Sequence, residues 1–260
     1  MTRVLPKKSL GQHFLVDLNV LGVIERLGAL DAGDVVLEIG PGLGVLTTYL
    51  ADRVRHVHAI ELDRGLETPL REALGDRPNV DLVFGDALAI GLDRLDPAPT
   101  KLVSNLPYSI ATPVVVESLT GLPSIEAWCV MVQREVAERF FADPGTKAYG
   151  AVSVVVRLHA RRTGFHTVSR TVFRPPPNVD SALVAFSRIP GPTRSEEVRR
   201  VVTAAFAHRR KTLANSLALA GVASRERAVE ALGRLGLPPA LRAEALEPEQ
   251  FVELTERLAE

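Results

Sequence analysis

The feature that most restricts the fold is a glycine-rich loop, Gly40-Pro41-Gly42-Leu43-Gly44, between an apolar run and a helical pattern. Glycines in such a loop permit positive φ and let the backbone approach a ligand without an intervening β-carbon. A dinucleotide-binding loop would carry a third glycine three residues after Gly42, where this chain has Val45. The loop favours a phosphate-free adenosine cofactor, and S-adenosylmethionine fits. A purely structural turn is the alternative.

Apolar, β-rich runs alternate with helical patterns through the first two-thirds of the 260 residues. We expect strands at residues 35–39, 56–60, 80–84, 101–104, 125–132 and 182–186, and helices at residues 43–51, 65–74 and 113–119. This alternation indicates an α/β fold, a Rossmann-like, mostly parallel sheet with helices on both faces. Ligands in such sheets bind beyond the carboxyl ends of the strands, where the informative residues of this chain also fall.

The segment Ile189-Pro190-Gly191-Pro192 indicates a domain boundary. Beyond it, apolar residues recur at helical spacing and strand signals are absent. We therefore expect a cofactor-binding catalytic domain over residues 1–189, including an N-terminal arm. A small all-helical domain should follow over residues 190–260.

The chain carries no net charge, but its charges are unevenly distributed. Residues 145–215 contain thirteen Lys or Arg and only three Asp or Glu, so this stretch carries +10 and the remainder −10. One basic region can bind a phosphate backbone while the molecule stays neutral overall. A solvated, arginine-rich surface is the alternative.

Other features of the composition exclude several classes of protein. Cys129 is the only cysteine and lies in an apolar run, so it indicates a buried strand residue and excludes a disulfide or a cysteine-based zinc cluster. No apolar run approaches the roughly 18 residues that span a bilayer, and the N-terminus lacks an apolar signal segment. We expect a cytoplasmic monomer without membrane association or a metal.

Two acidic residues at strand ends extend the cofactor hypothesis. Glu61 ends the second predicted strand, about twenty residues past the glycine loop, where a carboxylate can accept hydrogen bonds from both ribose hydroxyls. Asp86 ends the third predicted strand and can accept from the amino group of an adenine. Each carboxylate alone could simply cap the following helix, and capping is the preferred interpretation for Asp63.

Asn105-Leu106-Pro107-Tyr108 follows the fourth predicted strand and suits methylation of a nucleobase amino group. The lone pair of an exocyclic amine is delocalised into the ring, so the amine is a poor nucleophile. Asn105 Oδ1 can accept a hydrogen bond from one amino hydrogen and the Leu106 or Pro107 carbonyl from the other, which frees the lone pair. Tyr108 offers a face for base stacking. A plain strand-to-helix turn is the alternative for this motif read alone.

These residues, together with three further motifs, resemble the ribosomal small-subunit RNA adenine dimethyltransferase family (KsgA type) over nearly the whole chain. Lys7-Lys8-Ser9-Leu10-Gly11-Gln12-His13-Phe14-Leu15 matches the opening motif, which in that family touches the methionine end of the cofactor. Residues 171–181 match a late motif whose aromatic, here Phe173, stacks on the target base. Phe206-Ala207-His208-Arg209-Arg210-Lys211-Thr212-Leu213 resembles the basic helix start of the family's small domain.

The resemblance implies a complete set of site residues. Cofactor contacts fall on Gln12, His13, Leu15, Gly40, Gly42, Glu61, Leu62, Asp86, Ala87 and Asn105. Catalytic roles fall on Asn105, Leu106, Pro107, Tyr108 and Phe173, and RNA contacts on Lys7, Lys8, Arg209, Arg210 and Lys211. Two positions depart from the family pattern, because His13 stands where asparagine is frequent and Asn178 where lysine is usual.

The resemblance also implies a reaction and a partner. Methyl groups would pass from S-adenosyl-L-methionine, leaving S-adenosyl-L-homocysteine, to N6 of two adjacent adenines in the 3′-terminal hairpin of small-subunit (16S) ribosomal RNA. The substrate would be that RNA within the small ribosomal subunit or its late precursor, with a role in ribosome biogenesis.

Three rival functions share part of this evidence. The large-subunit (23S) RNA dimethyltransferases of macrolide resistance share the cofactor and catalytic motifs, although the basic segment Arg209-Arg210-Lys211-Thr212 favours the small-subunit group. A DNA adenine methyltransferase would usually have proline directly after the catalytic residue, where this chain has Leu106. A non-catalytic assembly or nucleic-acid-binding factor could share the fold, but this chain keeps every residue that the chemistry needs.

Overall fold

The computed structural model describes residues 6–7 and 11–260, which divide into two compact units. The first unit comprises Met1–Ala137 and Arg161–Arg188, and the second comprises Glu138–Ala160 and Ile189–Glu260. The second unit therefore contains the expected helical segment from residue 190 onward and, in addition, the stretch Glu138–Ala160 from the middle of the chain.

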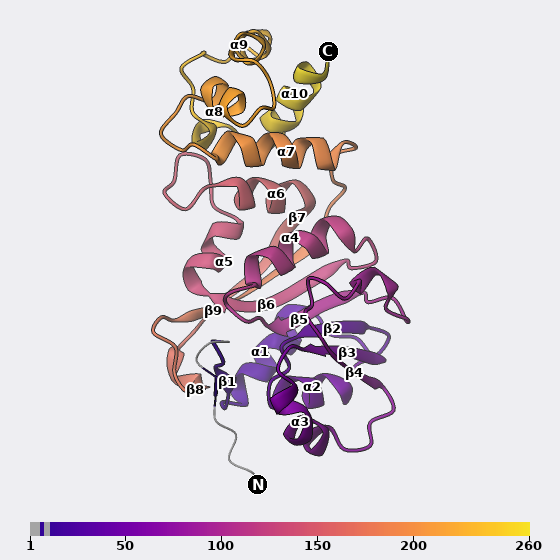
Figure 1. The fold of residues 1–260 in the computed structure, drawn as a ribbon. Coiled ribbons are helices and arrows are strands. Elements are labelled where there is room, and N and C mark those ends of the chain that lie inside the picture. Colours follow the sequence, from indigo (N-terminus) through magenta and orange to yellow (C-terminus); the bar gives the residue numbers. More distant parts are fainter. Residues whose placement is uncertain (1–5, 8–10) are drawn as a thin grey trace. The chain divides into compact units, whose positions relative to one another are not determined.

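The first unit is built on a seven-stranded sheet in the order β4-β3-β2-β5-β6-β9-β7 (Figure 1). Its strands are β2 (Val35–Ile39), β3 (His56–Glu61), β4 (Val80–Phe84), β5 (Lys101–Asn105), β6 (Ala127–Gln133), β7 (Ala160–Val168) and β9 (Ser181–Arg188). Neighbours from β4 to β6 run parallel, and β9 runs antiparallel to β6. The expected Rossmann-like α/β fold and its six predicted strands are confirmed, whereas β7 was not predicted.

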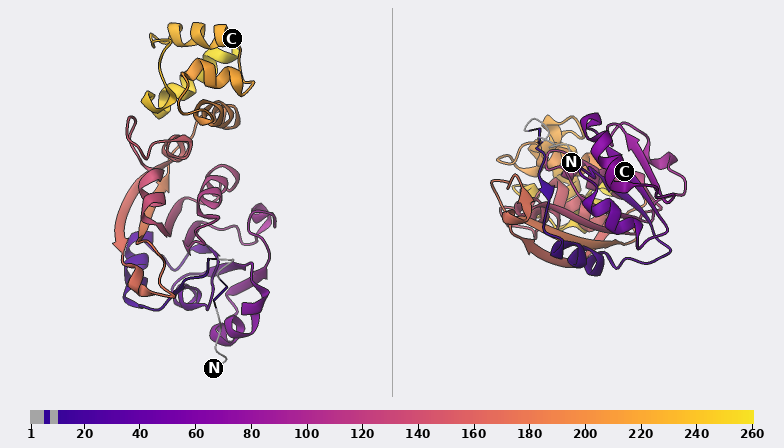
Figure 2. Two further views of the ribbon diagram at one scale, coloured as in Figure 1. Left: turned by 60° about the vertical axis from the view of Figure 1, so that its left-hand side comes forward. Right: turned by 90° about the horizontal axis from the view of Figure 1, so that it is seen from below.

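Helices cover both faces of this sheet (Figure 1, Figure 2). They are α1 (Asn19–Gly28), α2 (Val45–Ala51), α3 (Glu67–Leu74) and α4 (Ala111–Gly121), with short 3-10 turns η2 (Arg64–Leu66), η3 (Leu92–Arg94) and η4 (Arg170–Val172). The two strands β1 (Phe14–Leu15) and β8 (Phe173–Arg174) form a separate antiparallel pair.

Successive side chains of β6 point to opposite faces of the sheet and pack against different helices. Cys129 and Met131 pack into an apolar cluster with residues of α1 and α2. Trp128 points to the opposite face, where its indole N–H donates to Ser118 Oγ of α4 at 2.9 Å. Cys129 is 1% exposed, and burial raises its thiol pKa to about 12, so the prediction of a buried strand cysteine is confirmed.

The second unit is helical. Its helices are α6 (Ala151–His159), α7 (Ser195–Phe206), α8 (Leu213–Leu219), α9 (Arg225–Arg234) and α10 (Pro248–Ala259), with a 3-10 turn η5 (Ala243–Ala245). The remaining helix, α5 (Arg134–Phe140), contains the point at which the chain passes from the first unit to the second. Residues 190–260 contain no strand, as the sequence predicts. None of the helices in the described part of the chain has the length and apolar character needed to cross a membrane.

Candidate active site

The carboxyl ends of β2, β3, β4 and β5 surround one cavity of the first unit, with an empty volume of about 980 Å³ including its open mouth. Nine of the ten predicted cofactor residues line it, namely Gln12, His13, Gly40, Gly42, Glu61, Leu62, Asp86, Ala87 and Asn105. Leu15, the tenth, is buried and lines a smaller cavity that Gly40 and Gly42 also line. The strand ends therefore gather residues from Gly40 to Asn105, as expected for this fold, and the N-terminal segment adds Gln12 and His13.

The glycine loop needs its glycines for two separate reasons. Gly40, Gly42 and Gly44 have φ of 76°, 61° and 79°, a region that other residues enter only with strain. A β-carbon on Gly40 would also lie 2.9 Å from Pro107 Cγ, and one on Gly42 would lie 3.1 Å from Phe14 Cδ1. The loop is thus fitted against both the Asn-Leu-Pro-Tyr turn and the N-terminal segment.

Glu61 connects the glycine loop to the end of β3. Its Oε2 accepts from the Gly42 N–H at 3.1 Å and its Oε1 accepts from the Asp63 N–H at 2.8 Å. The side chain is buried, and this burial raises the Glu61 pKa above its usual range. Each carboxylate oxygen retains a lone pair, so the group can still accept from hydroxyls of a ligand in the cavity.

Asp63 holds the N-terminal segment against this edge of the sheet. It caps η2 by accepting from the Gly65 N–H at 2.9 Å, which confirms its predicted capping role. It also pairs with Lys7 Nζ at 2.6 Å and accepts from Gln12 Nε2 at 2.9 Å. Burial opposes ionisation of Asp63, but the bonds from Lys7 and Gln12 outweigh it and lower the pKa. Lys7 is therefore engaged within the protein, and its predicted contact with RNA stays a prediction.

Asp86 and its neighbour Ala87 follow β4 at the adjacent strand end. The exposed Asp86 side chain accepts from the Leu88 N–H at 3.0 Å and lines the cavity. Ala87 is buried and Leu62 is half exposed, and together they add apolar wall on either side of Glu61 and Asp86. The apolar side chains can contact the face of a flat heterocycle, and the carboxylate can accept a hydrogen bond from its amino group.

Asn105 ends β5 and points into the same cavity. Its Nδ2 lies 3.5 Å from the His13 carbonyl oxygen, at the outer limit of a hydrogen bond. This contact assigns the amide nitrogen to the side of His13 and leaves Oδ1 available as an acceptor. The N-terminal segment thus orients the side chain on which the proposed chemistry depends.

The next two residues fix a turn. The Leu106 N–H donates to the Met131 carbonyl at 3.1 Å, which anchors the turn to β6. The Pro107 carbonyl accepts from the Ile110 N–H at 3.1 Å, just before α4 begins. The Pro107 carbonyl is therefore already bonded within the turn, so Leu106 is the better source of a free backbone acceptor.

Tyr108 completes the turn and is tied to a distant segment. Its hydroxyl lies 2.6 Å from Ser181 Oγ at the start of β9, and burial raises the tyrosine pKa. The ring centroid lies 5.8 Å from that of His13, whose Nδ1 is 2.8 Å from the Pro175 carbonyl. A carbonyl only accepts, so the His13 Nδ1 carries the hydrogen.

One predicted residue, Phe173, lies away from the cavity that the described residues form. Phe173 is 1% exposed, pairs with Leu15 across β1 and β8, and packs in the apolar cluster that contains residues of α1 and α2. Stacking on a base would require Phe173 to leave this cluster, so that role stays a prediction. Lys8 lies outside the described residues.

The predicted basic segment lies in the second unit, between α7 and α8. Arg209, Arg210 and Lys211 are exposed, and Thr212 caps α8 by accepting from the Asn215 N–H. Arg209 Nη2 donates to the Lys147 and Tyr149 carbonyls at 3.4 and 3.3 Å. Arg210 and Lys211 thus present charge to solvent, whereas Arg209 is also part of the unit's own structure.

Three residues near the cavity were not predicted as functional. Phe14 lines the cavity and limits the space at Gly42, and Ser181 anchors Tyr108. Glu38, in the middle of a buried apolar strand, is 1% exposed, and burial raises its pKa to about 8. The position of Glu38, an acidic residue inside an apolar run, could have been recognised from the sequence. The contacts of Phe14 and Ser181 with the site depend on the three-dimensional fold.

The fold and the cavity define a Rossmann-like S-adenosylmethionine-dependent methyltransferase. A model of the family described as ribosomal RNA adenine dimethylase matches residues 4–260. The chain belongs to this family, and it is an enzyme that dimethylates adenine in ribosomal RNA.

Similar proteins cover nearly the whole chain. A Rubrobacter xylanophilus protein named Ribosomal RNA small subunit methyltransferase A is 47% identical over 255 residues, 98% of this chain and 95% of the relative. A Thermobifida fusca protein of the same name is 45% identical over 261 residues, 96% of this chain and 90% of the relative.

Solved structures agree with this fold. A dimethyladenosine transferase from Plasmodium falciparum superposes with a TM-score of 0.77 over 93% of this chain and 96% of its own, at 24% identity. The 23S rRNA methyltransferase ErmE superposes with a TM-score of 0.69 at 31% identity, over 95% of this chain and 100% of its own.

Proposed function

We propose that the protein dimethylates N6 of two adjacent adenines in the 3′-terminal hairpin of 16S ribosomal RNA, within the small subunit or its late precursor. One observation carries the choice of subunit. Relatives named Ribosomal RNA small subunit methyltransferase A reach 47% identity over 98% of the chain, whereas the large-subunit enzyme ErmE reaches 31%. We expect the protein to act in the cytoplasm, as a monomer, in ribosome biogenesis.

The cavity supports S-adenosylmethionine as the cofactor, which supplies a methyl group on a sulfonium. Glu61 would accept from the ribose hydroxyls, and Asp86 from the adenine amino group. The backbone at Gly40 and Gly42 leaves room for the ligand where a β-carbon would not fit. Gln12, His13 and Leu15 would surround the methionine end.

Asn105 and Leu106 would prepare the amine for attack. Asn105 Oδ1 and the Leu106 carbonyl would each accept a hydrogen bond from the amino group, which draws the lone pair of the nitrogen out of conjugation with the ring. The contact of Asn105 Nδ2 with the His13 carbonyl and the anchoring of Leu106 on β6 fix both acceptors before the substrate arrives. Preorganisation of this kind avoids reorientation during the reaction.

Proton removal needs no strong base. The nitrogen becomes acidic once it carries the new methyl group, and its proton can pass to solvent. Tyr108 would stack on the target base, worth about 1–3 kcal/mol. Phe173 is assigned the opposite face of that base. The positioned reactants account for much of the barrier lowering.

RNA binding outside the cavity is assigned to the exposed cations of the second unit, chiefly Arg210 and Lys211, with Arg209 beside them. Lys7 and Lys8 of the N-terminal segment are assigned the same role near the target base. Salt-dependent binding is the expected signature of these contacts, since each phosphate contact releases counterions.

The test is methyl transfer from labelled S-adenosylmethionine to small and large ribosomal subunits from a strain that lacks these modifications. We expect label in the small subunit, recovered as N6,N6-dimethyladenine at two adjacent positions. Label confined to the large subunit would assign the protein to the macrolide-resistance group. Cofactor binding without transfer to either subunit would instead favour a non-catalytic assembly factor.

The cofactor assignment has its own test. Calorimetry should show S-adenosylmethionine binding to the wild-type protein and none to Glu61→Ala. Glu72→Ala, an exposed change on α3, is the matched control and should bind as the wild type does. Undiminished affinity in Glu61→Ala would remove Glu61 from the site.

A further inference from the structure

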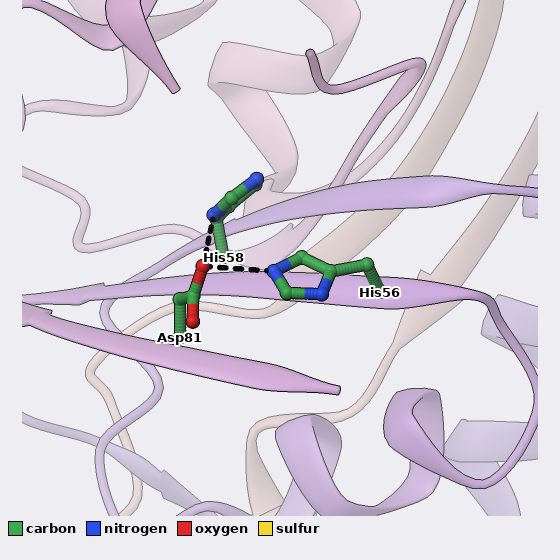
Figure 3. Close-up of side chains that lie close together, drawn as sticks. All are labelled: His56, His58 and Asp81. Atoms are coloured by element: carbon green, nitrogen blue, oxygen red, sulfur yellow. Dashed lines mark hydrogen bonds and ion pairs between the residues drawn. The ribbon is translucent and has the colours of Figure 1, made fainter. Parts of the chain in front are cut away.

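Two histidines and an aspartate form a cluster across β3 and β4 (Figure 3). His56 and His58 lie two residues apart on β3 and therefore point to the same face of the sheet. Asp81 is the register partner of His58 on the edge strand β4. The cluster lies towards the amino-terminal ends of these strands, whereas Glu61 and Asp86 follow their carboxyl ends.

The hydrogen bond of His58 defines its tautomer. His58 Nε2 lies 2.8 Å from the Pro97 carbonyl oxygen, which can only accept, so Nε2 carries a hydrogen. In the neutral ring, Nδ1 then presents a lone pair. Nδ1 is buried and has no hydrogen-bond partner in the described part of the chain. It faces Asp81 Oδ2 at 3.5 Å, at the centre of the cluster (Figure 3).

A buried nitrogen without a partner is costly, and a metal ion would remove that cost by accepting its lone pair. The bond from His58 Nε2 to a backbone carbonyl is the arrangement that orients metal-ligating histidines. His58 is thus held in the tautomer and orientation that a metal ligand requires.

The distances within the cluster fit a tetrahedral ion. Ligand atoms about 2.0–2.1 Å from a tetrahedral Zn²⁺ stand roughly 3.3 Å from one another. Asp81 Oδ2 lies 3.0 Å from His56 Nε2 and 3.5 Å from His58 Nδ1, and all three ligand atoms lie within 4.8 Å of one another. Small side-chain rotations would bring the three onto one ion without movement of the strands.

We propose that His56, His58 and Asp81 bind one divalent transition-metal ion, of the Zn²⁺ class, with the fourth position taken by water. Two imidazoles and one carboxylate suit Zn²⁺, Co²⁺ or Ni²⁺ better than Mg²⁺ or Ca²⁺, which prefer oxygen ligands alone. The Asp81 side chain is 52% exposed, which provides a path from solvent to the buried His58.

The proposed ion would have a structural rather than a catalytic role. It would join the edge strand β4 to β3 at a site separate from the methyl-transfer cavity that the described residues form. Because a folded-state ligand stabilises by mass action, the ion should raise the melting temperature. The expectation of no metal rested on the lack of cysteine ligands, whereas the histidines of β3 meet Asp81 only through strand pairing.

The experiment is calorimetric titration of Zn²⁺ into full-length protein stripped of metal with a chelator. We expect one ion per chain in the wild type and affinity weakened by more than about tenfold in Asp81→Asn, since loss of even an outer-shell partner costs that much. His56→Gln should weaken binding likewise. His166→Gln, an exposed histidine on β7, is the matched control and should bind as the wild type does.

Two further measurements distinguish binding of the ion by these three side chains from nonspecific metal binding at the surface. Co²⁺ should give the intense visible absorption of a tetrahedral site in the wild type but not in Asp81→Asn. Zn²⁺ should raise the melting temperature of the wild type and His166→Gln but not that of Asp81→Asn. Both readouts use folded protein, and Asp81→Asn changes a half-exposed side chain, so misfolding does not confuse the outcome.

Three results would overturn the proposal. Equal Zn²⁺ affinity in the wild type and Asp81→Asn would place the ion elsewhere. Failure of the folded wild type to bind Zn²⁺ would leave the cluster without a ligand function. Nitrogen NMR that found both His58 ring nitrogens protonated, with and without Zn²⁺, would identify a charged histidine paired with Asp81 instead.

Discussion

The Tyr108 hydroxyl lies 2.6 Å from Ser181 Oγ, which joins the Asn-Leu-Pro-Tyr turn to a residue 73 positions later in the chain. Ser181 ends the proline-rich motif and begins β9, which pairs antiparallel with β6. Leu106 is anchored on β6 as well. The Asn-Leu-Pro-Tyr turn is therefore fixed to β6 and to β9, the two strands that follow β5 in the sheet order. These two anchors account for how a four-residue turn can hold two acceptors in place.

The first prediction concerns this bond. Tyr108→Phe keeps the ring but loses the hydroxyl, and Ser181→Ala removes the partner, so each should destabilise the protein by about 1 kcal/mol. The double variant should cost little more than either alone, because one bond is lost in all three. Thermal or urea unfolding measures the cycle. Fully additive losses would show that the two hydroxyls do not interact.

The second prediction concerns Asn105. In Asn105→Ala the affinity for S-adenosylmethionine should stay nearly unchanged, while methyl transfer falls by about 10²–10³, the loss typical of one transition-state acceptor or donor. Calorimetry and single-turnover transfer to ribosomal subunits separate the two quantities. Asn19→Ala, an exposed amide at the start of α1, should leave both unchanged. Wild-type turnover in Asn105→Ala would refute the proposed mechanism.

The third prediction concerns the fit of the glycine loop. Gly40→Ala introduces strain at φ of 76° and places a β-carbon 2.9 Å from Pro107 Cγ, so it should destabilise the protein and displace the Asn-Leu-Pro-Tyr turn. Gly91→Ala has a comparable φ of 61° but its nearest contact is 3.5 Å. We expect Gly91→Ala to lose only about 1–2 kcal/mol of stability.

Activity distinguishes these two alanine variants. Methyl transfer measured below the melting temperature of both proteins should fall in Gly40→Ala and persist in Gly91→Ala. Equal activities would mean that Pro107 can move aside without consequence for the reaction.

The fourth prediction concerns the pH dependence of stability. Burial raises the Glu38 pKa from 4.5 to about 8, so between these values the folded state binds a proton that the unfolded state has lost. Stability from this group is fully present below about pH 4.5 and is lost as pH rises through about 8. The slope would reach up to about 1.4 kcal/mol per pH unit.

Glu38→Gln should flatten that slope, because the amide does not titrate. Unfolding free energies at several pH values between 5 and 8 measure the effect, and the exposed change Glu226→Gln on α9 serves as the control. Parallel pH profiles for wild type and Glu38→Gln would show that Glu38 is ionised in the folded protein.

The fifth prediction concerns the cations of the second unit. The double change Arg210→Ala and Lys211→Ala should weaken binding to the small subunit and reduce its dependence on salt, because fewer counterions are released. Arg234→Ala with Arg257→Ala removes the same charge from two arginines paired with Glu260. This control should leave the salt slope unchanged. Equal slopes for the two double variants would mean that Arg210 and Lys211 face away from RNA.

The predicted strands were found because buried parallel strands are nearly continuous apolar runs. Strand β7 lacked that signal, since most of Ala160–Val168 is exposed and polar at the sheet edge. In helix α6 the local sequence disagrees with the structure in the other direction. Ala151–His159 is rich in valine, which favours strands, yet it forms a helix in the second unit. Helix α1 was not predicted, although its buried residues Val20, Leu21 and Ile24 recur at helical spacing.

The site was predictable where it follows strand ends and unpredictable where it depends on pairing between distant segments. Gly40, Glu61, Asp86 and Asn105 each follow or end a strand, so topology alone brings them together. The anchoring of Tyr108 by Ser181 depends instead on contacts between segments, for which local sequence carries no signal.

The second unit is assembled from two separate stretches of chain. The Tyr149 hydroxyl donates to the Leu246 carbonyl at 2.7 Å, and the Gly145 N–H donates to the Glu244 carbonyl at 2.8 Å. The stretch Glu138–Ala160 is therefore bonded to residues in and just after η5, nearly a hundred positions later in the chain. A single genetic crossover near residue 189 would combine the native α6 with residues 189–260 of a different gene. The native α6 would then pack against helices with which it did not evolve. Exchange of this unit between related genes therefore requires two coordinated recombination events, which favours its inheritance together with the catalytic strands.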